Sequence, residues 1–310
     1  MLELDVADLA ASRFAVSPLG ETLRAVQLLS QPSPPPVNQP WVRWARAVLG
    51  RRPLRLPRLW PLVVNGLPFY PEFLVPAPDV TGPGIDAELA RLCATPATAV
   101  RASLRRVWEE HPWPDSAREL DTRPAESLAE IAAELGEAHD RLILPHWDRI
   151  RPVLDADIAY RAGLLAGGGA RALFRGLHPD LRWSGGTLTL ADSDPGPSPV
   201  RITLGPGGVV LMPSVFNWPQ VSLSRATSTH TILLYPARAT ATVWAGWAGG
   251  DLAGPGSGTG RTGGAGGAGG EAAAEALLGL PRTRLLIALR SPATTTALAR
   301  RLGVTPGAVS

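Results

Sequence analysis

The residues of this sequence best placed to meet an anion are arginines near its C-terminal end. No acid occurs after Glu275, and the last 35 residues contain five arginines. All 30 basic residues are arginine, so the remainder holds 25 arginines against 27 acids and carries −2. A basic module beside a mildly acidic body predicts an anionic partner, and chance clustering in a short window is the alternative. The five are Arg282, Arg284, Arg290, Arg300 and Arg301.

The same segment has the spacing of helices separated by a tight glycine turn. Ser291-Pro292 ends one amphipathic helix, and Thr294 or Thr295 caps the next. Gly303 then supplies a left-handed turn. Thr305-Pro306 begins a third helix, with the threonine at the cap and the proline at the first helical position. The middle helix is predicted to bury Leu298, Ala299 and Leu302.

With caps, glycine and apolar positions in one register, residues 284–310 resemble the winged helix-turn-helix of ArsR-type bacterial repressors. The resemblance implies a DNA-binding transcriptional regulator whose third helix enters the major groove. It places near base edges Thr305, Gly307, Ala308 and Ser310. It places near phosphates Thr294, Thr295, Arg300 and Arg301.

Segments of the preceding part resemble the large N-terminal region of actinobacterial members of the same ArsR-type group. The resemblance implies a body that senses a small-molecule effector or dimerises, and family members act as homodimers. No cysteine follows Cys93, so the cysteine cluster of metal-sensing members is missing, and we predict no metal or cofactor. The segments that carry the resemblance are residues 8–26, 70–78, 88–100, 145–158 and 211–219.

Residue types that serve in catalysis lack the spacing that catalysis needs, so no enzymatic activity is predicted. Ser214 stands in MPSVF without the glycine turn of a hydrolase nucleophile. The five histidines are scattered, and His139 and His146 share a helix face only if Pro145 does not break that helix. The acids interpreted as solvated helix ends are Glu109, Glu110, Asp155 and Asp157.

Helical periodicity dominates residues 1–170, after a short strand in MLELDV. Ser17-Pro18 opens a helix with Glu21 in its first turn, where the helix dipole favours an acid. The longest pattern covers residues 125–144, and a later helix over about 155–165 is expected to end at the glycines 167–169. Further helices are predicted from the apolar positions Trp41, Val42, Ala45, Leu49, Ile85, Leu89, Leu92, Val100, Leu104 and Val107.

The period changes to that of strands over residues 181–246. We predict a strand in RWSGGTLTLAD, a hairpin in VRITLGPGGVVLMPS, and strands in WPQVSLS, HTILLYPA and TATVWAGW. The predicted fold class is therefore α+β, with a helical N-terminal region followed by a small, mainly antiparallel sheet. Trp218, Trp244 and Trp247 are interpreted as core of this sheet, with a ligand pocket as the alternative.

Composition divides the chain into a body over 1–245, a flexible glycine-rich linker over 246–270 and a partial winged helix-turn-helix over 271–310. The linker stretch 264–269 matches a dinucleotide-binding glycine pattern, but it lies in low-complexity sequence with no acid about twenty residues on. Without a signal peptide or a long apolar run, a cytoplasmic location is expected.

Only five residues follow Thr305, and one helical turn is not stable alone. We therefore expect that the recognition helix is incomplete at Ser310 and that the wing is missing. This leaves an alternative function, a ligand-binding or scaffold protein that does not bind DNA.

Overall fold

A computed structural model describes most of the N-terminal four-fifths of the chain. The chain divides into two units, Met1–Trp244 and Ala245–Ser310. The predicted linker and winged helix-turn-helix, with all eight residues predicted to contact DNA, lie outside the described residues. The described residues are 2–3, 11–67, 70–78, 82–184, 187–190, 202–203, 208–224 and 231–245.

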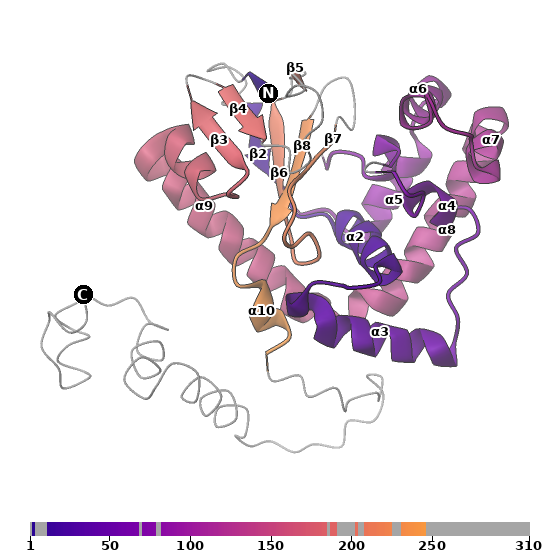
Figure 1. The fold of residues 1–310 in the computed structure, drawn as a ribbon, viewed down its shortest axis with the longest axis horizontal. Helices are drawn as coiled ribbons and strands as arrows, with labels where there is room; N and C mark the ends of the chain where they lie inside the picture. Colours follow the sequence, from indigo (N-terminus) through magenta and orange to yellow (C-terminus); the bar gives the residue numbers. More distant parts are fainter. Residues whose placement is uncertain are drawn as a thin grey trace, which may run out of the picture. The chain divides into compact units, whose positions relative to one another are not determined.

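Helices supply most of the regular structure of the first unit (Figure 1). The described α-helices are α2 (Pro18–Ser30), α3 (Gln39–Arg51), α4 (Trp60–Val63), α5 (Ile85–Cys93), α6 (Ala97–Val107), α7 (Asp115–Thr122), α8 (Pro124–Leu142), α9 (Trp147–Arg175) and α10 (Thr240–Val243). Short 3-10 helices are η1 (Pro36–Asn38), η2 (Glu72–Leu74) and η3 (Leu144–His146).

The predicted α+β class is confirmed, but the described strands form two mixed sheets rather than one mainly antiparallel sheet. One sheet has the order β3-β4-β1-β5 and the other β2-β6-β8-β7. In the second, β6 lies parallel to both β2 and β8, and β7 is antiparallel to β8. The bounds are β1 (Leu2–Glu3), β2 (Arg13–Phe14), β3 (Leu181–Ser184), β4 (Thr187–Leu190), β5 (Ile202–Thr203), β6 (Val209–Ser214), β7 (Ser222–Ser224) and β8 (Thr231–Pro236).

The predicted hairpin over VRITLGPGGVVLMPS is wrong, because its two arms belong to different sheets. β5 pairs with β1, whereas β6 pairs with β2 and β8. Every residue of β6 and of β8 is buried. A strand that is covered on both faces has a continuous apolar sequence, which is typical of a parallel sheet. The glycine-rich turn between the two segments gives no indication of this parallel pairing.

Two other strand predictions change. RWSGGTLTLAD is not one strand, since β3 and β4 pair in antiparallel within it. TATVWAGW contains the helix α10 instead of a strand. The Thr240 hydroxyl donates to the Ala237 carbonyl, and Ala239 takes a left-handed conformation with φ 58°. This local turn starts a helix, although the β-branched residues of the segment favour a strand.

The helix predictions are largely confirmed. The Ser17 side chain caps α2 by accepting from the Gly20 amide, and Pro18 is the first helical residue. The apolar stripe predicted for residues 125–144 is buried in α8. Within α9, Gly169 has a non-helical backbone with φ 64° and ψ −165°, so two helical segments meet at a kink there and the predicted helix end at the glycines is confirmed. A second segment then continues to Arg175, and its Leu173 and Phe174 are buried.

Clusters of buried apolar side chains hold many of these elements together, and two of these clusters join several elements each. The first joins α2, α5, α6, α7 and α8, and the second joins the end of α9 to both sheets. In Figure 1 α9 lies beside β3, while α6 and α7 lie at the far end of the helical part. Among the described residues there is no helix with the length and apolar content that crossing a bilayer requires.

Candidate functional site

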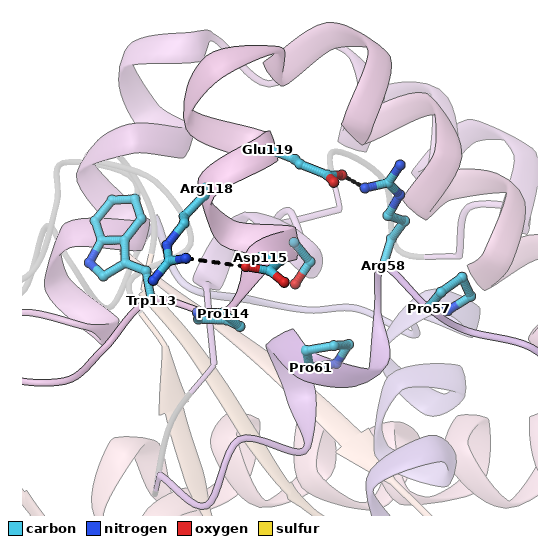
Figure 2. Close-up of a pocket in the computed structure, with 9 residues that line it drawn as sticks. Pro57, Arg58, Pro61, Trp113, Pro114, Asp115, Arg118 and Glu119 are labelled. Atoms are coloured by element: carbon cyan, nitrogen blue, oxygen red, sulfur yellow. Dashed lines mark hydrogen bonds and ion pairs between the residues drawn. The ribbon is translucent and has the colours of Figure 1, made fainter.

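A surface pocket of about 660 Å³ lies between the segment that begins α4 and the start of α7. Figure 2 shows Trp113 and Arg118 on one side of it and Pro57 and Arg58 on the other. Pro61 and Pro114 lie between these two sides. Volumes of about 300–1,000 Å³ are usual for small-molecule sites, so this pocket has the dimensions of a binding site.

Prolines set the helix that forms one wall of the pocket. Pro114 immediately precedes α7 with an extended backbone, and its carbonyl accepts from the amides of Ala117 and Arg118 at 3.0 and 3.2 Å. Pro124 ends α7, because the residue before a proline is disfavoured in helical conformation. Arg123 accordingly has φ −132° and ψ 64°. The position of α7 is therefore fixed at both ends by local sequence.

The opposite wall is held by carboxylates from the helical layer. The Glu134 carboxylate of α8 accepts from the backbone amides of Arg58 and Leu59. The Arg58 side chain forms an ion pair with Glu119 of α7, and its Nε lies 2.8 Å from Glu130 of α8. These contacts tie the loop before α4 to two helices, so the pocket is bounded by ordered elements.

Ser116 is the polar group of the pocket wall that lacks an internal partner. It is the second residue of α7 and is only 6% exposed. Its hydroxyl oxygen has no hydrogen-bond partner in the protein. A buried hydroxyl without a partner lowers the stability of the folded protein.

This feature predicts that Ser116→Ala raises the free energy of unfolding by about 1 kcal/mol, because alanine removes an unpaired buried hydroxyl. Urea unfolding followed by circular dichroism measures the change. Ser30→Ala is the matched control, since the Ser30 hydroxyl donates to the Gln27 carbonyl and its removal is expected to be neutral or destabilising. A loss of stability in Ser116→Ala would show that the hydroxyl is satisfied in the folded protein.

A second polar group lies buried at the start of α2. The Glu88 carboxylate of α5 accepts from the Ser17 hydroxyl at 2.6 Å and from the Leu19 amide at 2.8 Å. Glu88 is fully buried, and burial raises its pKa to about 7. An acid at a helix N-terminus is favoured by the dipole, so this contact anchors α5 to α2.

Glu21 lies one turn further along α2, in the first turn as predicted, and its carboxylate is buried. It is 1% exposed, and its carboxylate accepts from the Val215 amide at 3.2 Å and from the Ser214 hydroxyl. Burial raises the pKa of Glu21 to about 8. Asn38 adds a bond from its side-chain amide to the Val215 carbonyl. The group closes the carboxyl end of β6 and is enclosed by protein.

A buried ion pair joins α9 to β8. The Arg161 Nε donates to the Asp157 carboxylate at 2.8 Å, and both side chains are almost fully buried. The other carboxylate oxygen of Asp157 accepts from the Arg238 amide at 3.0 Å. The Arg161 guanidinium also lies 4.7 Å from the centre of the Tyr235 ring. The interpretation of Asp157 as a solvated helix end is therefore wrong, because the residue faces the sheet.

The remaining residues considered for chemistry fall into separate environments. Asp155 is exposed and pairs with Arg151, as expected for a solvated acid. His139 lies in the last turn of α8, near Asp140. His146 lies in η3 and packs edge-on against Trp44. Burial, with a smaller effect of Arg149, lowers the pKa of His146 to about 4. Within the part of the chain that the structure describes, no three His, Cys, Asp or Glu side chains converge on a metal-sized site.

Two of the three tryptophans assigned to the sheet core can be placed. Trp244 is buried among aromatic rings that include Phe216, whereas Trp218 is 49% exposed. Trp247 lies outside the described residues. Neither placed tryptophan lines the pocket of Figure 2; that role falls to Trp113, which sequence reasoning did not single out. The Trp113-Pro114 dipeptide, which precedes a short helix, is the sequence feature that could have drawn attention to this position.

No protein-family model matches the chain, and comparison with curated proteins and with solved structures finds no significant match.

Proposed function

We propose that this chain is a DNA-binding transcriptional regulator of the ArsR type, acting as a repressor, with the unit Met1–Trp244 as its sensing body. The observation that carries the proposal is the register of residues 284–310. There a threonine cap, the turn glycine Gly303 and the Thr305-Pro306 helix start fall at the spacing of a helix-turn-helix. The basic charge of the last 35 residues supports a polyanionic partner.

The proposed domain arrangement follows from the same sequence. Residues 246–270 act as a flexible tether, since glycine-rich composition gives a chain with little stiffness. The DNA-contacting residues are proposed to be those predicted from the register, with Arg300 and Arg301 at phosphates. We further propose that the protein is a homodimer, which sedimentation velocity of the full chain measures directly.

Binding to duplex DNA tests this proposal through its salt dependence. Each neutralised phosphate contributes about 0.9 to the slope of log affinity against log salt. We therefore expect the double variant Arg300→Gln/Arg301→Gln to bind DNA more weakly and to reduce the slope by about 1.8. Fluorescence anisotropy with a labelled duplex, at several salt concentrations between about 50 and 200 mM, measures both quantities.

The matched control for this experiment is Arg105→Gln/Arg118→Gln. It removes the same charge from exposed positions on α6 and α7 of the first unit. Its slope is expected to equal that of the unmodified chain. Equal slopes for all three proteins, or an absence of salt-sensitive binding, would contradict the assignment of Arg300 and Arg301.

A second candidate function is a ligand-binding protein that does not contact DNA. It is favoured by the pocket of Figure 2, which lies wholly in the first unit and has the size of a small-molecule site. The two candidates differ in one measurement. A chain that binds a small molecule but shows no salt-dependent affinity for duplex DNA supports the second and excludes the first.

A further inference from the structure

We infer that the exposed side of α3, with the loop that follows it, binds the phosphates of duplex DNA as a second contact besides the one proposed for residues 284–310. The inference deepens the proposed function, on which the choice of duplex DNA as the polyanion rests. The surface lies in the described part of the first unit. We call it the α3 basic face, and it consists of Arg43, Arg46, Arg51, Arg52 and Arg55.

The α3 basic face lies in a stretch of sequence without acids. No Asp or Glu occurs between Glu21 and Glu72, whereas seven arginines do. All five arginines of the face are exposed, and none of them has a carboxylate of the described residues at ion-pair distance. Arg118 and Arg123, by contrast, are exposed arginines that pair with neighbouring acids. The face is therefore a local excess of positive charge on the first unit.

Helix geometry gathers three of these arginines on one side of α3. Positions three, four, seven and eight apart share a helix face, so Arg43, Arg46 and Arg51 lie together with Ala47 and Gly50 between them. A Cβ atom added at Gly50 would meet nothing within 4 Å, so this side is open. In Figure 1, α3 runs along the lower edge of the first unit. The small residues between the arginines allow the helix to approach a phosphate chain closely.

The opposite side of α3 is anchored to the body of the protein. The Trp41 indole donates to the Leu142 carbonyl at 3.2 Å, and its ring packs against Phe216. After the helix, the Arg141 guanidinium of α8 donates to the Pro53 carbonyl at 3.2 Å. Binding to an ordered surface costs less conformational entropy than binding to a mobile one, so this anchoring favours the phosphate contact.

The dimensions and chemistry of the α3 basic face fit a phosphate backbone. α3 has 13 residues and is therefore about 20 Å long. A duplex presents one phosphate per about 1.7 Å of its axis, so about twelve phosphates lie along that length. Arginine can bind phosphate oxygens bidentately, which a lysine cannot do. A membrane surface fits less well, because an interfacial helix inserts large apolar side chains and this face has only Ala47 and Gly50 between its arginines.

The salt dependence of DNA binding by the full chain tests the inference. Arg43→Gln/Arg46→Gln/Arg51→Gln is expected to weaken binding at about 100 mM salt by a factor of ten or more. It is also expected to reduce the slope of log affinity against log salt by about 2.7, because three phosphate contacts are lost. Fluorescence anisotropy with two labelled duplexes of unrelated sequence measures both quantities. The loss should be the same for the two duplexes, since phosphate contacts carry no sequence information.

Two further triple variants serve as controls, and circular dichroism verifies that all variants fold. Arg118→Gln/Arg123→Gln/Arg151→Gln removes the same charge from arginines that already pair with acids, and it should keep the slope of the unmodified chain. Replacing Arg43, Arg46 and Arg51 with lysine keeps the charge and should also keep the slope. Equal slopes for the glutamine variant of the face and for the control in the paired arginines would overturn the inference.

The C-terminal variant distinguishes failure of this inference from failure of the proposed function. If Arg300→Gln/Arg301→Gln lowers the slope and the glutamine variant of the α3 basic face does not, the inference fails and the proposed function stands. If only the variant of the face lowers the slope, the inference stands and the assignment of Arg300 and Arg301 fails. Cosedimentation with phosphatidylserine-containing vesicles covers a lipid partner. Vesicle binding that the variant of the face abolishes, with an unchanged DNA slope, would also overturn the inference.

Discussion

Replacing Arg161 with alanine is expected to lower the free energy of unfolding by about 3–5 kcal/mol, because it leaves the buried Asp157 carboxylate without its counter-ion. The pair is almost completely shielded from solvent. Asp157 keeps the Arg238 amide as a donor, which does not neutralise its charge. Urea unfolding monitored by circular dichroism and tryptophan fluorescence measures the loss.

α9 provides its own control for this prediction. Arg151 and Asp155 form an ion pair at the same i,i+4 spacing, but their side chains are 35% and 51% exposed. Exposed pairs contribute little, so Arg151→Ala is expected to change stability by less than about 1 kcal/mol. The double variant Asp157→Leu/Arg161→Met removes both buried charges and is expected to recover much of the loss. If Arg161→Ala and Arg151→Ala cost the same, the buried pair does not stabilise the contact between α9 and β8.

The stability of the protein is expected to fall by about 2 kcal/mol as the pH rises from 6.5 to 8, through ionisation of Glu21. Burial raises the pKa of Glu21 from 4.5 to about 8. A raised pKa means that the folded state binds the proton more tightly than the unfolded state. The resulting stabilisation is complete below pH 4.5 and is lost progressively until the pH passes 8.

The choice of pH window separates Glu21 from other groups. Glu88, with its pKa raised to about 7, loses its contribution mainly between pH 4.5 and 7. The lowered pKa of His146, about 4, makes the stability of the protein rise with pH, and this rise is complete above pH 6.5. Between pH 6.5 and 8 the slope therefore reports chiefly on Glu21.

Glu21→Gln tests this assignment, since glutamine keeps a donor and an acceptor but does not ionise. Chemical denaturation at pH 6.5, 7.25 and 8 is expected to give a clearly shallower profile for this variant, because only the smaller contribution of Glu88 remains in this window. The exposed Glu126, paired with Arg123, supplies the control Glu126→Gln, whose profile should follow the unmodified chain. A variant Glu21→Gln with an unchanged pH slope would rule out Glu21 as the titrating group.

Local sequence was sufficient to predict most helices of the first unit. α8 begins at Pro124 and carries Leu128, Ile131 and Leu135 at helical spacing, and all three are buried. The Ser17 cap of α2 was equally predictable, because capping depends on residues three positions apart. α7 was missed because its eight residues present only a short apolar pattern, in which Leu120 is the one large apolar residue.

Strand pairing was predicted poorly, because partners come from distant parts of the sequence. β2 at Arg13–Phe14 lies beside β6 at Val209–Ser214, a separation of almost 200 residues. Nothing in the two residues of β2 indicates that choice. The continuous burial of β6 and β8 also removes the alternation by which an exposed strand is recognised.

The pocket of Figure 2 was not predictable from sequence, because the sequence does not show which of its residues come together. Its walls come from two segments more than fifty residues apart, and Glu134 and Glu130 of α8 hold one of them in place. Ser116 resembles any helix serine until packing buries its hydroxyl without a partner. Proximity and burial arise only when the chain has folded.

The sequence by itself determined the α+β class and the positions of the longer helices, and it alone is the basis of the helix-turn-helix that we predict for residues 284–310. These features follow from caps, turns and periodicity, which act over a few residues. The tertiary structure alone decided the pairing of β2 with β6, the burial of Glu21 and Asp157, and the pocket beside Ser116. Each of these features depends on which side chains from distant parts of the sequence exclude water from a residue. Local sequence propensity does not predict those contacts.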